Sequence, residues 1–355
     1  MDKIRFAVIG LGRMGRGHIG EIRQIAGDKF ELAAVCDHAP DRLENLPPEW
    51  GTSYRKYSSL DELLKDKDVD MVTIAVRHLD HTPMAIKVLE SGKYCVIEKP
   101  VAPNVKTMKQ LQACSEAHPG HLFIRQNRRF EPHFVKCFEL MKSGIIGEPQ
   151  YVNMHICCGF CRRNDWMTIP EFFGGLLSNW GPHMIDQALR FLESPVKDIW
   201  ADVRRVISIG AGDDLSKIIL KGENGRVVEV ELTGANAHPG REYEIIGSKG
   251  TIACEPGANR IHVRALDPSI ELKDLKPHPE NPPFAYGNFD ETLAFYDADF
   301  DLPPTSCPHM WKHIAANIFD GIPYPIKFEE ALEVVRVTEE VIRKSGFAPL
   351  QQFLV

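Results

Sequence analysis

The chain opens on Ile4-Arg5-Phe6-Ala7-Val8-Ile9, which runs directly into Gly10-Leu11-Gly12-Arg13-Met14-Gly15. The first six residues predict a buried strand, and the next six form a G-x-G-x-x-G turn. A helix-like stretch follows at residues 18–25, and a second apolar run at residues 30–36 ends in Asp37. Strand, glycine turn, helix, strand and acid in this order predict a dinucleotide-binding site.

Each part of this pattern has a physical role. Gly10 allows a tight turn, Gly12 lets the backbone approach a pyrophosphate, and Gly15 lets helix and strand pack closely. All six turn residues are therefore predicted to bind the cofactor, with free N–H groups of the helix facing the anion. A structural glycine turn without a ligand is the alternative.

The acid after the second strand bears on the choice of cofactor. Asp37 is expected to accept hydrogen bonds from the adenosine ribose diol and to repel a 2′-phosphate. The pattern therefore favours NAD over NADP. The neighbouring His38 and Arg42 keep NADP open.

Length and composition restrict the class of protein. The 355 residues suffice for about two domains, and the formal charge of −7 disfavours nucleic acids and anionic membranes as partners. No uncharged apolar run reaches the roughly 18 residues of a membrane span. The strand at the start leaves no room for a signal peptide. We therefore expect a cytoplasmic protein.

The nine cysteines are scattered, and Cys36, Cys95, Cys114 and Cys137 lie inside apolar runs, which favours reduced, buried thiols. The segment 155–161 contains His155 and a cluster of Cys157, Cys158 and Cys161 with a Cys-x-x-Cys spacing. It has no second paired half and lies in a strand-like stretch where alternate side chains face opposite ways. We therefore predict no metal site.

The first third of the chain alternates strands and helices. Apolar runs predict strands at residues 4–9, 31–36, 71–76, 94–97 and 121–125, with helical stretches between them. This alternation predicts an α/β domain over residues 1–124, a Rossmann-type doubly wound parallel sheet with helices on both faces. Ligands bind such sheets at the carboxyl ends of the strands.

Residues 125–355 predict a second domain of the α+β class. A helix at 132–143, a strand at 151–158 and a helix at 179–192 come first. Six period-two runs between residues 198 and 265 follow, joined by turns rich in Gly and Pro, and they indicate a largely antiparallel sheet. Helices return at 308–319 and 328–344.

One segment with reactive groups is Glu98-Lys99-Pro100, directly after the strand at 94–97. A lysine at this end of a doubly wound sheet should point into the ligand crevice, and Pro100 allows a cis peptide bond. A solvated surface turn is the alternative interpretation.

The second such segment spans residues 173–186. A helix capped by Ser178 would hold Pro182 in its first turn, where no N–H donor is needed. Asn179, His183 and Asp186 would then share one face. The helix dipole would keep His183 neutral, as a general base for an alcohol must be. A histidine bonded to a neighbouring carbonyl is the alternative.

Together these motifs resemble the Gfo/Idh/MocA family, named after glucose–fructose oxidoreductase and inositol dehydrogenase. The resemblance extends over residues 7–15, 72–85, 92–100, 127–130, 144–149, 174–186 and 321–328. It implies a nicotinamide cofactor and hydride transfer at a secondary alcohol or ketone of a sugar, cyclitol or related polyol. It also implies that the open-faced sheet of the C-terminal domain builds a homodimer or homotetramer.

By position, the resemblance makes Lys99 the lysine that hydrogen-bonds the reacting oxygen and His183 the catalytic acid/base. It places a first group of residues near the cofactor and a second near the substrate. The first group is Val76, Arg77, His81, Glu98, Lys99 and Asn127, and the second is Arg163, Asp165, Trp166, Asn179 and Asp186.

The chain departs from the family pattern at one important position. Many relatives carry Asp where this chain has Asn179, and an amide can orient His183 but cannot stabilise an imidazolium by charge. Proton transfer would then depend more on Lys99, or Asp186 would compensate. Two other functions stay open: transient oxidation of a sugar ring followed by elimination, which would cleave a glycosidic bond, and non-catalytic nucleotide sensing.

Overall fold

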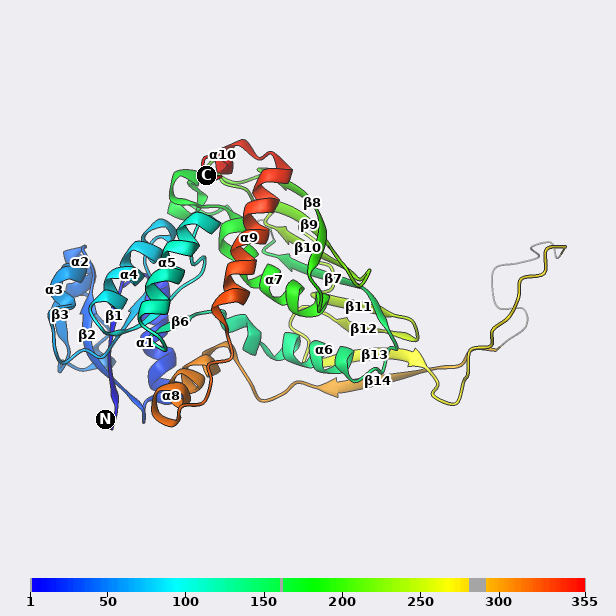
Figure 1. Ribbon diagram of the computed structural model, residues 1–355, viewed down its shortest axis with the longest axis horizontal. Helices are drawn as coiled ribbons and strands as arrows, with labels where there is room; N and C mark the ends of the chain where they lie inside the picture. The colour runs from blue at the N-terminus through cyan, green and yellow to red at the C-terminus, as the bar shows by residue number, and fades with distance from the viewer. Residues whose placement is uncertain (1, 160–161, 281–291, 355) are drawn as a thin grey trace.

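The computed structural model describes residues 2–159, 162–280 and 292–354. Its first part is a six-stranded parallel sheet in the order β3-β2-β1-β4-β5-β6 (Figure 1). The strand order reverses between β1 and β4, and ligands of such sheets bind beside this reversal. The strands are β1 Ile4–Ile9, β2 Phe30–Cys36, β3 Arg55–Tyr57, β4 Met71–Ile74, β5 Tyr94–Ile97 and β6 Leu122–Ile124.

Helices cover both faces of this sheet because successive strand residues point to opposite sides. Phe6 and Val8 of β1 pack with α1 and α8 on one side, and Ala7 and Ile9 pack with α4 and α5 on the other. The predicted doubly wound domain is therefore confirmed. Its helices are α1 Arg13–Ala26, α2 Pro40–Glu44, α3 Leu60–Leu63, α4 His81–Glu90 and α5 Val105–Ala117, and α8 spans Met310–Asp320.

The second part is an eight-stranded sheet in the order β14-β13-β12-β11-β7-β10-β9-β8. Among the described strands of this sheet, β7 and β10 alone pair in parallel, so the prediction of a largely antiparallel sheet is confirmed. The strands are β7 Pro149–Cys157, β8 Val196–Arg204, β9 Leu215–Gly222, β10 Val227–Thr233, β11 Tyr243–Gly247, β12 Gly250–Cys254, β13 Arg260–Leu266 and β14 Phe295–Asp301.

One face of the second sheet is covered by helices and the other is open (Figure 1). Buried residues of α6, α7 and α9 pack against inward-facing strand residues such as Val152 and Ile245. Their sequence neighbours Tyr151 and Ile246 are exposed on the opposite face, as the strand alternation requires. The covering helices are α6 Pro132–Lys142, α7 Leu176–Leu192 and α9 Phe328–Ser345, and α10 spans Ala348–Gln351.

Two segments cross between the predicted halves. Trp311 of α8 is fully buried in the core of the first sheet, and Ala331 and Val335 of α9 also join a core of that sheet. The predicted domain boundary at residue 124 therefore stays a prediction. In the structure, helices from the C-terminal part of the chain pack into the core of the first sheet.

The cysteines and the helices bear on two of the expectations from sequence. Cys36, Cys95 and Cys137 are buried free thiols as predicted, whereas Cys114 is free but only half-buried. Cys157 donates a hydrogen bond to the Asn236 carbonyl, while Cys161 lies outside the described residues. Among the helices in the described ranges, none has both the length and the apolar character that crossing a bilayer requires.

Candidate dinucleotide and substrate site

The glycine turn between β1 and α1 is shaped by close backbone approach. Gly10 has a φ of +90°, and a Cβ atom there would overlap the Ala75 carbonyl of the turn after β4. A Cβ on Gly15 would overlap the Gly10 carbonyl. Around Gly12 nothing lies within 4 Å, so this position faces open space. The three glycines thus meet three different physical demands.

The N-terminus of α1 is available to an anion. Gly12 is the N-cap, and no side chain in the described part of the chain caps the helix. The first N–H groups of a helix need an external partner, and a pyrophosphate is a suitable one. Gly12, Arg13 and Met14 line a cleft of about 520 Å³ at the carboxyl ends of the strands. This cradle fits the pyrophosphate of a nicotinamide dinucleotide.

Asp37 lies at the end of β2 and lines the same cleft, but its side chain is only 2% exposed. Its two oxygens accept hydrogen bonds from Leu11 N at 2.7 Å and Ala39 N at 2.9 Å, and Arg42 lies 3.3 Å away. Burial alone would raise the pKa of Asp37, but these donors outweigh it and lower the pKa. The carboxylate is thus charged and orders the glycine turn, in addition to its predicted contact with a ribose.

The turns after β4 and β5 are joined by His81. Its Nδ1 lies 2.8 Å from the Pro100 carbonyl oxygen, and its Nε2 lies 3.2 Å from that of Val76. The Lys99–Pro100 peptide bond is cis. Val76, Arg77 and His81 all line the cleft, and the Arg77 guanidinium lies 4.4 Å over the Phe172 ring. His81 therefore fixes the wall from which Lys99 projects.

His78 is a cleft residue that sequence reasoning did not assign. It is buried, its Nδ1 lies 2.8 Å from the Phe173 carbonyl oxygen, and its ring packs edge-on against Trp166. Burial lowers the pKa of His78 to about 3, helped by the nearby His81. The signal that could have identified His78 as a cleft residue is its position directly after Arg77, in the turn that follows β4.

Glu98 lines the cleft from a buried network of charges. Its Oε1 accepts from Arg125 at 3.0 Å and lies 2.8 Å from His18 Nε2, while its Oε2 accepts from Lys99 N at 3.1 Å. Burial would raise the pKa of Glu98, but Arg125, His18 and Lys99 hold it well below its usual value. Glu98 is thus a fixed negative charge beneath Lys99.

Lys99 reaches from the turn after β5 to helix α7. Its Nζ donates to the Asn179 carbonyl at 2.8 Å and to Asn179 Oδ1 at 3.1 Å. Burial lowers the pKa of Lys99 to about 8, although Glu98 opposes this. Asn179 therefore contacts Lys99 through its oxygens, and the expectation that its amide orients His183 stays a prediction.

Helix α7 begins earlier than predicted, which corrects the argument about His183. The helix starts at Leu176 with Gly175 as N-cap, so Pro182 lies inside it and Ser178 is not the cap. The carboxylate of Asp213, remote in sequence, accepts from Leu177 N at 2.7 Å and satisfies the helix start. His183 is two turns into the helix, beyond the reach of the dipole.

His183 is nevertheless neutral, for a different reason. It is 7% exposed, and its Nδ1 has no hydrogen-bond partner among the described residues. Burial lowers the pKa of His183 well below its usual value, and the charges of Lys99 and Arg128 lower it further. His183 is thus a neutral imidazole that the charge of Lys99 reaches, although its side chain is not among the residues that line the cleft.

Asp186 is held away from the cleft. Both its oxygens accept from Arg129, at 2.7 and 2.5 Å, and Arg129 also contacts Glu330 of α9. The Asp186 carboxylate is paired with Arg129 and does not line the cleft, so the structure lends no support to a role in substrate binding or in compensating for Asn179, and that role stays a prediction. Asn127 is also buried and lies outside the cleft lining.

The remaining substrate candidates lie together at the mouth of the cleft. Arg163 Nη2 donates to Asp165 Oδ2 at 2.7 Å, and Asp165 Oδ1 accepts from Met167 N. Both residues and Trp166 line the same cleft as the glycine turn. The arrangement supplies charged and aromatic groups next to Lys99.

Comparison with known proteins agrees with this architecture. Residues 4–125 match the model of an oxidoreductase family with an NAD-binding Rossmann fold, and residues 134–253 match the GFO/IDH/MocA C-terminal domain. The chain belongs to the Gfo/Idh/MocA family of oxidoreductases. The chain is therefore an NAD-dependent oxidoreductase whose N-terminal domain has the NAD-binding Rossmann fold, and the assignment of the cofactor to the cleft at the glycine turn stays a prediction.

The relatives of this chain include dehydrogenases of cyclitols and sugars. Myo-inositol 2-dehydrogenase of Thermotoga maritima is 27% identical over 70% of this chain and 74% of the relative. D-apiose dehydrogenase of Rhizobium rhizogenes is 25% identical over 72% of this chain and 75% of the relative. The structure of GenD2 from gentamicin A biosynthesis, solved in complex with NAD, has a TM-score of 0.77 at 20% identity over 98% of this chain and 95% of that chain.

Proposed function

We propose that the protein transfers a hydride between NAD and a secondary alcohol or ketone of a sugar, cyclitol or related polyol. The observation that carries this proposal is Lys99, which follows β5, lines the cleft with a pKa lowered to about 8, and acts through its charge on the neutral His183 of α7. The named relatives that act on a cyclitol and on a sugar support the substrate class.

In this proposal the two side chains divide the work on one substrate oxygen. When bound, the nicotinamide accepts a hydride from the alcohol carbon or returns one to the ketone. Lys99 donates a hydrogen bond to the reacting oxygen and stabilises the negative charge that develops on it. His183, being neutral, takes the hydroxyl proton as general base.

The mouth of the cleft provides for a hydroxyl-rich substrate. Asp165 has acceptor capacity for sugar hydroxyls, Arg163 has donors, and the Trp166 ring offers an apolar surface for C–H groups. We assign these three residues to substrate binding. Their roles rest on their position in the cleft lining beside Lys99 and Asn179.

The test combines a substrate panel with two variants. The protein is incubated with NAD and free sugars, cyclitols, polyols and glycosides, and reduced nicotinamide is followed by absorbance beside product analysis. Lys99→Ala and His183→Ala should each lower turnover by roughly 100- to 10,000-fold while NADH binding, followed by fluorescence, is retained. Lys142→Ala, whose exposed amine pairs with Glu193, is the matched control and should keep full turnover.

Other outcomes would assign a different function. Cleavage of a glycoside without accumulation of NADH would indicate transient oxidation followed by elimination. Tight NAD binding without turnover of any panel member would indicate a nucleotide-sensing protein. Unchanged turnover in both Lys99→Ala and His183→Ala would refute the proposed roles.

We further propose NAD over NADP as the working cofactor, because the charged Asp37 repels a 2′-phosphate. The nearby Arg42 and the exposed His38 would partly offset that repulsion. Comparing the dissociation constants of NADH and NADPH tests this preference. Equal or tighter binding of NADPH would contradict it.

We also propose that the open sheet face builds a homodimer or homotetramer in the cytoplasm. The apolar side chains of Tyr151, Trp200, Ile246 and Phe295 are exposed on the strands of this sheet, and exposed apolar patches commonly mark interfaces. Light scattering should show an oligomer that Trp200→Glu dissociates. A wild-type monomer would contradict the assembly.

A further inference from the structure

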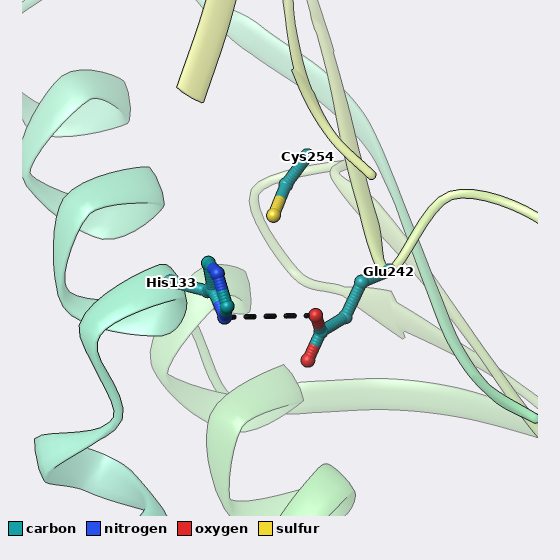
Figure 2. A group of neighbouring side chains, drawn as sticks. All are labelled: His133, Glu242 and Cys254. Atoms are coloured by element: carbon teal, nitrogen blue, oxygen red, sulfur yellow. Dashed lines mark ion pairs between the residues drawn. The ribbon is translucent and has the colours of Figure 1, made fainter. Parts of the chain in front are cut away.

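A second cluster of reactive side chains lies between α6 and the strands β11 and β12 (Figure 2). His133 comes from the first turn of α6, Glu242 directly precedes β11, and Cys254 ends β12. A ring nitrogen, a carboxylate oxygen and a thiol sulfur from these residues all lie within 4.8 Å of one another. We propose that His133, Glu242 and Cys254 form a zinc site, separate from the dinucleotide cleft.

The hydrogen bonding of His133 prepares one ring nitrogen for a metal. Its Nε2 lies 2.7 Å from the Ala258 carbonyl oxygen, which can only accept, so the proton sits on Nε2. Nδ1 then carries a free lone pair and faces Glu242 Oε2 at 3.7 Å. Metal-binding histidines usually donate their other N–H to a carbonyl or carboxylate in this way, which fixes the ring.

The other two donors are held in place by backbone pairing. Glu242 N donates to the Cys254 carbonyl at 2.8 Å, so the two segments are joined directly. The Glu242 side chain is 12% exposed, and its Oε2 lies 3.7 Å from Nδ1 of His133, which carries no charge to neutralise it when the proton is on Nε2. Cys254 is fully buried. A largely buried carboxylate is costly unless it is paired or binds a metal, so a cation here would relieve that cost.

The donor set selects the metal. Imidazole, carboxylate and thiolate together suit zinc, whereas the sulfur disfavours magnesium and calcium. In a tetrahedral zinc site a nitrogen and an oxygen donor lie about 3.3 to 3.5 Å apart, so the His133–Glu242 spacing of 3.7 Å would have to shorten slightly. The Cys254 sulfur lies within 4.8 Å of the other two donor atoms, and on binding zinc it would exchange its hydrogen bond to the Glu255 carbonyl for the metal. Three protein donors leave a fourth position open.

A second His and acid group in the chain provides a matched control. His155, Glu229 and Glu231 also lie within 4.8 Å of one another. However, Lys217 Nζ lies 2.8 Å from Glu229 and 3.8 Å from Glu231, so a cation already neutralises these carboxylates. This group also lacks a thiol. We therefore expect His155→Gln to leave zinc binding unchanged.

The binding test uses the full-length protein freed of metal by dialysis against a chelator. Zinc is titrated in competition with a chromophoric chelator. Wild type and His155→Gln should bind one equivalent, whereas His133→Gln and Glu242→Gln should bind at least about 100-fold more weakly. Zinc should raise the midpoint of thermal unfolding of the wild type and of His155→Gln. It should leave the midpoints of His133→Gln and Glu242→Gln unchanged.

A spectroscopic test needs no variant that might fail to fold. Cobalt added to the wild-type protein should give the intense visible bands of a tetrahedral site and a thiolate charge-transfer band, which Cys254→Ser should abolish. The proposal is overturned if wild type binds no stoichiometric zinc, if cobalt shows no thiolate band, or if His133→Gln and Glu242→Gln bind zinc as His155→Gln does.

Discussion

Replacing Asn179 by aspartate should raise the pKa of Lys99. In the wild type, Lys99 Nζ lies 3.1 Å from Asn179 Oδ1, and burial holds its pKa at about 8. Asn179→Asp keeps the size of the side chain and puts a negative charge where a neutral oxygen now lies. Because an opposite charge favours the protonated amine, Lys99 should stay cationic to higher pH.

The size of the effect follows from Coulomb's law. Two unit charges about 4 Å apart interact by about 4 kcal/mol at an effective dielectric constant of 20, and about 1.4 kcal/mol corresponds to one pKa unit. The two groups line an open cleft, so water weakens the interaction. We expect a rise of about two to three units, to a pKa of about 10 or above.

The measurement does not require a known substrate. Only the neutral amine reacts with an acylating reagent, so the rate of Lys99 modification against pH gives its pKa when the labelled peptide is quantified by mass spectrometry. Asn179→Leu is the matched control, because it removes the side-chain acceptor without adding charge. Its labelling midpoint should stay near that of the wild type.

In turnover, the same substitution should shift the basic limb of the pH profile by a similar amount. If Lys99 in Asn179→Asp is labelled with the same midpoint as in the wild type and in Asn179→Leu, the electrostatic coupling between these two side chains is refuted.

Three further perturbations have defined outcomes. Gly12→Ala should fold normally and weaken NADH binding by about tenfold or more, since its Cβ meets only open space in the cleft, whereas Gly15→Ala should lower the free energy of unfolding in a denaturant titration. Asp186→Asn should cost about 3 kcal/mol of stability by leaving the buried Arg129 partly unpaired, with turnover little changed; a large loss of turnover in folded protein would contradict its structural role. Burial raises the pKa of Asp213 to about 7, so between about pH 4 and 7 the native state holds a proton that the unfolded state releases. The free energy of unfolding of the wild type should therefore fall as pH rises through this range, by about 4 kcal/mol relative to Asp213→Asn. A stability difference between these two proteins that is independent of pH would exclude that titration.

Sequence reasoning succeeded where local pattern decides the structure. The central strands of the parallel sheet are continuous apolar runs, and β1, β2, β4, β5 and β6 were predicted to within a few residues. The edge strands β3 and β14 were missed. Arg55–Tyr57 is short and polar, and Phe295–Asp301 alternates aromatic and acidic residues with both sets at least partly exposed, so neither carries a buried-strand signal.

The candidate site shows where local pattern is insufficient. The start of α7 depends on Asp213, which is brought to the helix only by the fold. Helical spacing placed Asp186 near His183, but the spacing does not reveal that Arg129 holds its carboxylate elsewhere. Likewise the cluster of Figure 2 combines residues from three separate segments, and no spacing in the sequence indicates it.

The most direct measurement is the structure of the protein with NADH and a polyol or sugar that the substrate panel identifies. We predict that the pyrophosphate lies on the N-terminus of α1 at Gly12. Lys99 Nζ and the His183 ring should both lie within about 3 Å of the same substrate oxygen. A nicotinamide outside the cleft, or a substrate oxygen contacted by neither side chain, would contradict the proposed function.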